Sequence, residues 1–244
     1  MISKKIESLR GLVLAVTPYK DDSAIATFAC ENGIFSILLR GLYKPKSLLK
    51  SMLLIFNYVE VNVYKNEDNF FIATQASSIK DISNIYLDYK SNVTLTFLQE
   101  LTMDLFQYGD NFPLIEYNLF LKALEEKKDI LTILLLIVGE IYKVLGLKMD
   151  TEECINCLSK KNIVSYSISD GGFYCKKCSP IEKVDSMYLY ILKFSFLGFN
   201  EVNVNKMVPK EFGKKIFLEL IENLINYFDL KKLSSLSMLL SILD

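Results

Sequence analysis

Two pairs of cysteines are the part of this sequence in which residue type and spacing point most directly to chemistry. Cys154 and Cys157 form one C-x2-C pair, Cys175 and Cys178 form the second, and residues 158–174 separate them. Each pair presents two thiolates to one ion, and two pairs complete a tetrahedron of sulfur around zinc at Zn–S distances of about 2.3 Å. The spacing therefore predicts one structural Zn²⁺ ion held by these four cysteines.

Other uses of the cysteines can be weighed from the same sequence. A catalytic zinc ion keeps an open position for water, and four thiolates leave none. The chain contains no histidine, which excludes the H-x-E element of nucleobase deaminases and any Cys–His nucleophile pair. Paired disulfides or a thioredoxin-like motif remain as alternatives, although a reducing compartment and the lack of a surrounding βαβ pattern disfavour them. Cys30 lies in a strand pattern and is interpreted as a small buried hydrophobic residue.

The first eighty residues contain five short apolar runs separated by turns. The runs are residues 11–16, 24–28, 34–39, 53–64 and 70–76. Asn32-Gly33 is a strong tight-turn signal between the second and third runs. Because no crossover helix fits between these runs, we predict a five-stranded antiparallel barrel, for which the oligonucleotide-binding (OB) fold is a natural candidate. An SH3-like barrel would give the same pattern.

Helical patterns follow the barrel, so that the predicted class is a multidomain α+β fold. Apolar residues at helical spacing predict helices at 87–108, 114–124, 130–145, 186–197, 210–228 and 234–243. The predicted parts are an OB-fold domain at 1–80, a helical domain at 81–150 and 181–244, and a four-cysteine zinc element at 151–180. The longest apolar run, 131–146, carries Glu140 and Lys143 and is too short to span a bilayer. We therefore expect a soluble cytoplasmic protein.

Charge is unevenly distributed along the chain. The formal net charge is −1, which on its own argues against binding to nucleic acid. Residues 1–80 contain 10 Lys and Arg against 7 Asp and Glu, however, whereas residues 81–150 contain 6 against 11. This asymmetry suggests different partners for the two parts.

The basic residues of the first part gather in one predicted loop. The loop contains Arg40, Tyr43, Lys44, Lys46 and Lys50. A glycine and a proline within it favour an exposed turn. Several cations beside a tyrosine suit phosphate contacts and base stacking, which is how proteins bind single-stranded nucleic acid without sequence preference. A solvated loop whose lysines only keep the surface soluble is the alternative, and charge alone leaves both open.

The order of the motifs along the chain resembles the RecO family. In the barrel region the resemblance rests on Gly11-Leu-Val-Leu, Thr17-Pro-Tyr19, Glu31-Asn-Gly33 and Arg40-Gly41 followed by Lys44-Pro-Lys46-Ser47. Farther on it rests on Leu145-Gly146-Leu147 before the cysteines and Asp170-Gly-Gly-Phe173 between them. The match covers nearly the whole chain in order and length.

The resemblance implies a recombination mediator that is not an enzyme. Such a protein would bind single- and double-stranded DNA, anneal complementary strands, and act with RecR to help load RecA onto DNA coated by single-stranded-DNA-binding protein (SSB), whose C-terminal tail it would also bind. Carried over by position, Arg40, Lys44 and Lys46 would contact DNA, with Arg10 and Lys50 as further candidates.

The sequence departs from the family at one place. Family members often end in a histidine- and arginine-bearing segment around Gly-Arg-x-Leu-x-Ser, whereas this chain has Tyr227-Phe-Asp-Leu-Lys-Lys-Leu-Ser234. Contacts made by that segment are therefore not carried over. Two rival functions remain: a zinc-ribbon adaptor that binds only proteins, and a nucleic-acid enzyme that uses carboxylates and a metal ion, for which no paired-carboxylate motif is evident.

Overall fold

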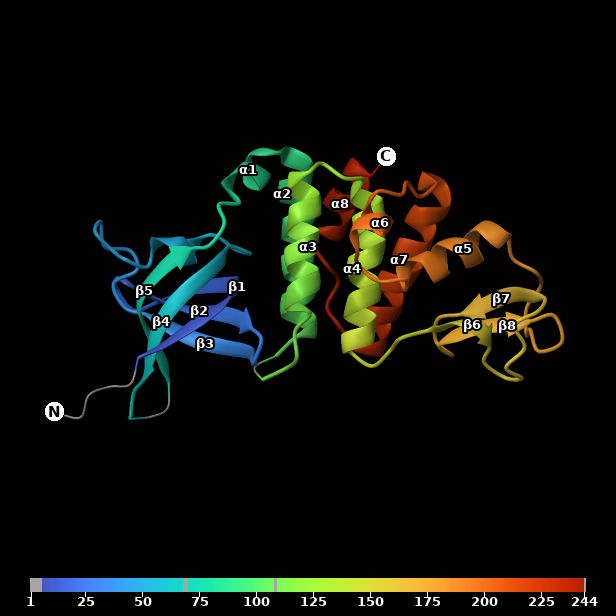
Figure 1. The fold of residues 1–244 in the computed structure, drawn as a ribbon, viewed down its shortest axis with the longest axis horizontal. Helices are drawn as coiled ribbons and strands as arrows, with labels where there is room; N and C mark the ends of the chain where they lie inside the picture. The colour runs from blue at the N-terminus through green and yellow to red at the C-terminus, as the bar shows by residue number, and fades with distance from the viewer. Residues whose placement is uncertain (1–5, 68–69, 108, 244) are drawn as a thin grey trace. The chain divides into compact units, whose positions relative to one another are not determined.

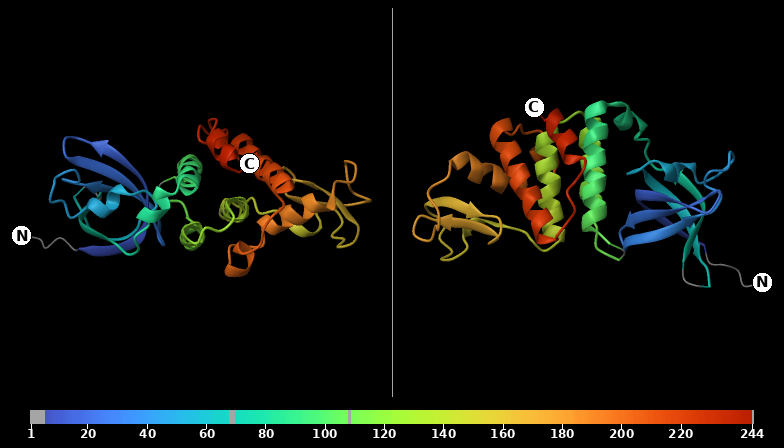
Figure 2. Two further views of the ribbon diagram at one scale, coloured as in Figure 1. Left: turned by 90° about the horizontal axis from the view of Figure 1, so that it is seen from above. Right: turned by 180° about the vertical axis from the view of Figure 1, so that it is seen from behind.

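The computed structural model describes residues 6–67, 70–107 and 109–243, and within the last range it describes only the backbone of residue 201 (Figures 1 and 2). The chain divides into two compact units, Met1–Leu114 and Ile115–Asp244. The first unit thus includes residues 81–114, which the sequence assigned to the helical domain; the finer division into four parts stays a prediction. Among the described residues, no helix combines the length and the apolar character needed to cross a membrane.

The first unit is built on a closed five-stranded barrel (Figure 1). Its strands are β1 (Glu7–Tyr19), β2 (Ser23–Cys30), β3 (Gly33–Leu39), β4 (Tyr58–Lys65) and β5 (Phe71–Ser78), joined in the order β1-β2-β3-β5-β4. The predicted barrel is confirmed, with antiparallel pairing everywhere except between β3 and β5, which are parallel. This exception is unavoidable, because a closed ring with an odd number of strands cannot alternate direction at every step.

The fourth strand begins later than its sequence suggested. The apolar run 53–64 reads as one strand, but a short 3₁₀ helix, η1 (Lys50–Leu53), and a turn occupy its beginning. Phe56 adopts a left-handed backbone conformation with φ of 57°. The turn buries the Phe56 side chain completely and lets its amide donate to the carbonyl oxygen of Val13 at 2.6 Å. Burial of one large aromatic side chain therefore overrides the local strand pattern.

Helices make up the remainder of the first unit and most of the second. The first unit contains α1 (Ser83–Leu87) and α2 (Tyr89–Leu105). Asp88 caps α2 by accepting from the Ser91 amide, and Gln99 on α2 donates to the Leu14 carbonyl oxygen of β1 at 3.0 Å. The helices that follow are α3 (Leu114–Glu125), α4 (Ile130–Val144), α5 (Ser186–Ser195), α6 (Glu201–Val204), α7 (Lys210–Tyr227) and α8 (Leu236–Ile242).

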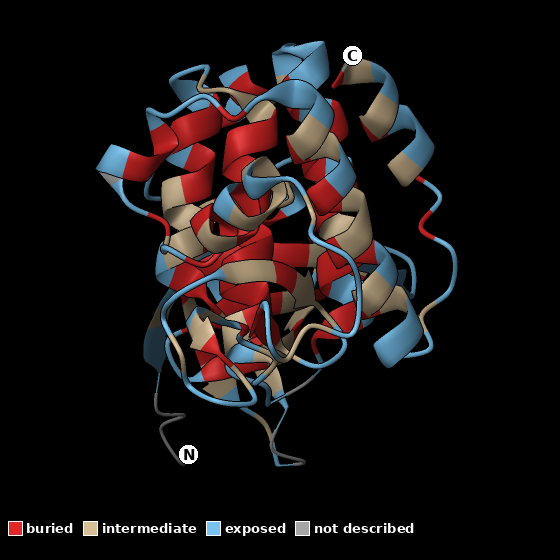
Figure 3. Ribbon diagram, turned by 90° about the vertical axis from the view of Figure 1, so that its right-hand side faces the viewer, coloured by how far each residue is buried: buried red, intermediate tan, exposed pale blue. Residues whose placement is uncertain are grey.

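The core of the second unit surrounds α4. Every residue from Leu131 to Tyr142 is buried. Figure 3 shows buried residues of the chain in red. A small three-stranded sheet follows α4 in the chain and consists of β6 (Asp150–Cys154), β7 (Ile163–Ser167) and β8 (Gly172–Cys175) in the order β6-β8-β7. Glu140, at the end of the buried stretch, accepts from Lys143 Nζ at 2.9 Å and from the Phe199 amide at 3.0 Å. These contacts hold the loop after α5 against α4.

At Gly139 the backbones of α4 and α5 lie so close together that there is no room for a side chain. A Cβ atom at this position would lie 1.8 Å from the Ser195 carbonyl oxygen. Inside a helix, alanine is ordinarily about 1 kcal/mol more favourable than glycine, but here we expect Gly139→Ala to lower the free energy of unfolding by about 1–3 kcal/mol. Urea denaturation measures the change, and the exposed Glu222→Ala in α7 serves as the control. Unchanged or increased stability of Gly139→Ala would contradict the close packing.

Candidate metal centre and nucleic-acid interface

The four paired cysteines converge at one end of the small sheet. Their Sγ atoms all lie within 4.8 Å of one another, and those of Cys157 and Cys175 are 3.6 Å apart. Two thiolates on a tetrahedron around zinc are separated by about 3.8 Å, given Zn–S distances of about 2.3 Å. The disulfide alternative does not describe this arrangement, because all the cysteines are free thiols. The spacing therefore suits a four-coordinate metal ion.

Hydrogen bonding at the cysteines also suits a metal ion. Desolvation raises the pKa of Cys154, but donors led by the backbone amide of Cys175 lower it to about 6. Cys178 behaves oppositely, since its hydrogen bond to the Cys157 thiol raises its pKa to about 12. Four thiols this close therefore do not ionise together unaided. A divalent cation supplies the charge that lets all four become thiolates.

Local structure explains why the two cysteine pairs meet. β7 and β8 form an antiparallel hairpin in which Ile163 is paired with Cys175. The amide of Ile155 donates to the Phe173 carbonyl oxygen at 2.9 Å, which ties the first pair to β8. Leu158 closes the first knuckle in a left-handed conformation, and its amide donates to the Cys154 carbonyl oxygen at 2.8 Å.

Side chains link the cysteine-bearing sheet to the helices of the same unit. Tyr166 on β7 donates through its hydroxyl to Glu219 Oε2 on α7 at 2.6 Å. Burial raises the pKa of Tyr166, and the hydrogen bond to Glu219 adds to the effect, so the hydroxyl stays protonated and can donate. Lys193 on α5 pairs with Glu152 on β6 at 2.8 Å. Sequence reasoning did not find these residues, because no spacing pattern relates them.

The basic loop of the barrel is an ordered turn with its cations outward. We call residues 40–50 the cation turn. Leu42 and Leu49 are buried in the barrel core and anchor the turn, while Gly41 has φ of +69° and lets it reverse direction. The predicted DNA-binding residues Arg40, Tyr43, Lys44, Lys46 and Lys50 are all exposed.

The cations of the cation turn form no ion pair with other described residues. Within the described part of the chain, Arg40, Lys44, Lys46 and Lys50 take part in no ion pair. The Tyr43 amide donates to the Asp22 carbonyl oxygen at 3.2 Å, which joins the turn to the β1–β2 loop. That loop carries Lys20, which lies over the ring of the exposed Tyr19. Tyr19 and Lys20 were not predicted, although the position of this loop in an OB barrel could have indicated them.

Arg10, the remaining predicted DNA contact, has a different environment. It lies on β1 directly opposite Glu60 on β4, and its Nε pairs with Glu60 Oε1 at 2.9 Å. Both residues line a shallow hollow of about 560 Å³ that also includes Glu31. The Glu60 carboxylate offsets the charge of Arg10, so Arg10 offers less to a phosphate than the cation turn does.

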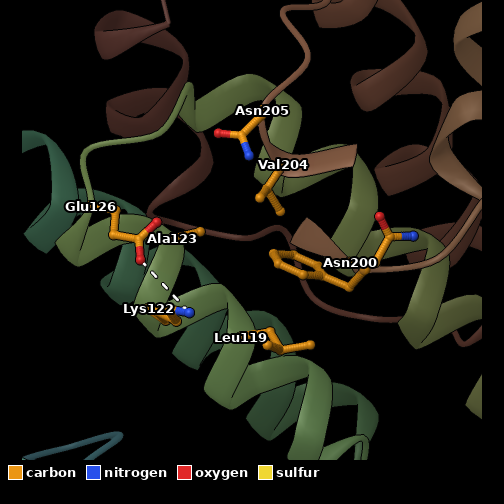
Figure 4. A pocket seen from close by; sticks show the side chains of 8 residues that line it. Leu119, Lys122, Ala123, Glu126, Asn200, Val204 and Asn205 are labelled. Atoms are coloured by element: carbon orange, nitrogen blue, oxygen red, sulfur yellow. Dashed lines mark ion pairs between the residues drawn. The ribbon is translucent and has the colours of Figure 1, made fainter. Parts of the chain in front are cut away.

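The helical unit has a hollow of about 240 Å³ between α3 and the segment that contains α6 (Figure 4). Leu119, Ala123 and Val204 contribute apolar side chains to it. At its rim Glu126 pairs with Lys122 at 3.9 Å and with Lys128 at 3.5 Å. The acidic and basic groups here are engaged with one another, and the hollow presents no arrangement typical of acid–base catalysis.

Two sequence models of one protein family match this chain. The model described as "Recombination protein O N terminal" matches residues 4–81, and the one described as "Recombination protein O C terminal" matches residues 86–204. The first range contains the barrel and the cation turn, and the second contains the four cysteines.

Similar proteins carry the same description. The DNA repair protein RecO of Halalkalibacterium halodurans is 26% identical over 181 residues, which are 73% of this chain and 70% of that protein. The DNA repair protein RecO of Bacillus subtilis is 26% identical over 171 residues, with 69% and 67% covered. Among solved structures, asparaginyl-tRNA synthetase from Pyrococcus horikoshii matches 60% of this chain and 33% of its own at 10% identity, with a TM-score of 0.29 that carries no argument.

Proposed function

Since the chain belongs to the RecO family of DNA repair proteins, we propose that it is a DNA-binding recombination mediator rather than an enzyme. It would bind single- and double-stranded DNA and anneal complementary strands. The observation that carries the proposal is the cation turn, an anchored loop on which Arg40, Lys44 and Lys46 are exposed and form no ion pair with any residue that the structure describes.

The turn would act through phosphate neutralisation. Each cation that meets a backbone phosphate releases a counterion, which favours binding without reading the base sequence. Tyr43, which is 39% exposed within the turn, would stack on an unpaired base. Holding two strands on one protein raises their effective concentration for pairing, so annealing requires no covalent step.

The four cysteines would hold one structural Zn²⁺ ion. When bound, the ion supplies binding energy that stabilises the small sheet and leaves no coordination site for a substrate. Cys154 and Cys175 are buried and would form the inner side of the site, while Cys157 is exposed. Backbone amides that donate to the sulfur atoms support thiolates at this position.

Family membership supports DNA and other recombination proteins as partners. We propose RecR as a direct partner, the C-terminal tail of SSB as a second one, and the loading of RecA onto SSB-coated single strands as the result. Acting on chromosomal DNA, the protein would work in the cytoplasm.

Fluorescence anisotropy with a labelled oligothymidine at increasing salt tests the proposal. We expect binding at low salt, with log affinity falling linearly against log salt at a slope of about −0.7 per phosphate contact. Zinc content measured on the same sample should be one ion per chain. A purified protein that ignores oligonucleotides in dilute buffer would instead support the protein-binding adaptor.

A further inference from the structure

The zinc element carries a second basic surface at the end where the cysteines lie. Lys160 and Lys161 precede β7, and Lys176 and Lys177 follow β8. Because β7 and β8 are antiparallel, the beginning of one and the end of the other meet at the same end of the hairpin. The Lys176 amide donates to the Asn162 carbonyl oxygen at 2.9 Å, which brings the two lysine pairs together. We call these four lysines the basic tip.

All four side chains of the basic tip are exposed, and in the described chain none of them forms an ion pair. The acidic groups of the element are unevenly placed, and Glu153 lines the same hollow as Lys160. Asp150 and Asp170 lie at the opposite end of the sheet, where the Asp150 amide donates to the Gly171 carbonyl oxygen and Asp170 accepts from the Tyr174 hydroxyl. Glu152 is held by Lys193. Asp150 and Asp170 are thus separated from Lys176 and Lys177, which follow the other end of β8.

We propose that the basic tip is a second binding surface for the phosphate backbone of nucleic acid, distinct from the cation turn. This inference rests on the proposed function, which requires two strands to be held by one protein. The cation turn belongs to the first compact unit and the basic tip to the second, so the chain carries one phosphate-binding surface on each unit. One surface would hold the first strand while the other recruits its complement.

Charge and residue type favour nucleic acid over a folded protein as the occupant. The four cations are lysines on flexible stems, which neutralise phosphates as point charges and need no planar, bidentate partner. Exposed aromatic anchors, which are typical of protein interfaces, are missing from the described residues 158–162 and 176–181. A polyanion with regularly spaced charges satisfies all four lysines together.

A capture experiment tests the inference on the full chain. An immobilised oligothymidine is first saturated with protein. A second, differently labelled oligothymidine, which cannot pair with the first, is then added, and its capture is measured. Annealing of complementary oligonucleotides is measured separately by energy transfer. For the variant Lys160→Ala/Lys161→Ala/Lys176→Ala/Lys177→Ala we expect at least tenfold less capture and at least tenfold slower annealing, with zinc content unchanged. The matched control replaces four other exposed lysines, Lys90, Lys127, Lys231 and Lys232, with alanine and should behave as the wild type.

The possible outcomes separate this inference from the proposed function. If the wild type binds no oligonucleotide, the proposed function fails. If the wild type binds and anneals DNA but the tip variant does so equally well, only the inference about the basic tip fails. If that variant then has a reduced zinc affinity, its lysines merely offset the charge of the thiolates. If it instead loses binding to an acidic peptide, the tip binds a protein partner. Should the quadruple variant not fold, Lys176→Gln/Lys177→Gln gives the same readouts with less disturbance.

Discussion

A Cys175→Ser variant is expected to lose its zinc ion and, with it, the ordered structure of the small three-stranded sheet. Cys175 is buried at the end of β8, and its Sγ lies 3.6 Å from that of Cys157. Replacing this thiol removes one of the two buried ligands of the proposed tetrahedral site. Structural zinc contributes about 10–16 kcal/mol of apparent binding free energy in zinc-finger peptides, far more than three short strands supply. Zinc per chain should fall from one to near zero, and hydrogen exchange should become fast across residues 150–178.

The fifth cysteine provides the matched control for this prediction. Cys30 is equally buried but belongs to the barrel core of the first unit, whereas the other four cysteines belong to the second. Cys30→Ala should therefore keep full zinc content and a protected sheet, with at most a modest loss of barrel stability from the missing sulfur. If Cys175→Ser retained one tightly bound zinc ion per chain, the assignment of the four cysteines as ligands would be wrong.

Replacing Arg40, Lys44 and Lys46 with alanine is expected to give the second large effect, on DNA affinity. For single-stranded DNA, each phosphate that the protein neutralises changes the log of the binding affinity by about 0.7 for a tenfold change in salt concentration. Three lost contacts should lower affinity for oligothymidine by about 100-fold at 0.1 M salt and reduce the magnitude of the salt slope by about 2. The loss should be similar for every DNA sequence, because phosphate contacts carry no base information.

A charge-matched variant distinguishes the cation turn from a general effect of net charge. Lys127, Lys231 and Lys232 are exposed lysines of the other unit, and their replacement with alanine changes the formal charge by the same amount. This control should keep wild-type affinity and slope. Equal losses in both variants would show that the turn holds no particular contact, and an Arg10→Ala variant should lose little, since Glu60 already pairs with Arg10.

Features that depend on local spacing could be predicted from the sequence, whereas features that depend on contacts between distant residues could not. The cysteine spacing was sufficient to predict that four thiols converge, because each C-x2-C knuckle and the hairpin between them are local structures. The turn at Phe56 was missed because its cause, burial against β1, involves residues far away in the chain.

The same distinction applies to the candidate binding residues. Exposure of the cation turn followed from its glycine and proline, whereas the pairing of Arg10 with Glu60 depends on the register of β1 and β4 and could not be predicted from either strand alone. The link between Tyr166 and Glu219 is likewise a product of tertiary packing. The roles of Arg40, Lys44, Lys46 and the other predicted DNA contacts stay predictions until affinity is measured.

Closure of the five-stranded barrel limits how the first unit can associate with other molecules. Open sheets expose unpaired backbone amides and carbonyls along their outermost strands, and these groups can template strand addition or aggregation. In the described barrel each strand has hydrogen-bonded neighbours on both sides, although β3 and β5 pair only at Ile37–Phe71 and Leu38–Ile72, so closure limits main-chain templating mainly to that seam. Elsewhere on the barrel, recognition of partners falls to side chains, and charge-altering substitutions can redirect its interactions without exposing further strand edges.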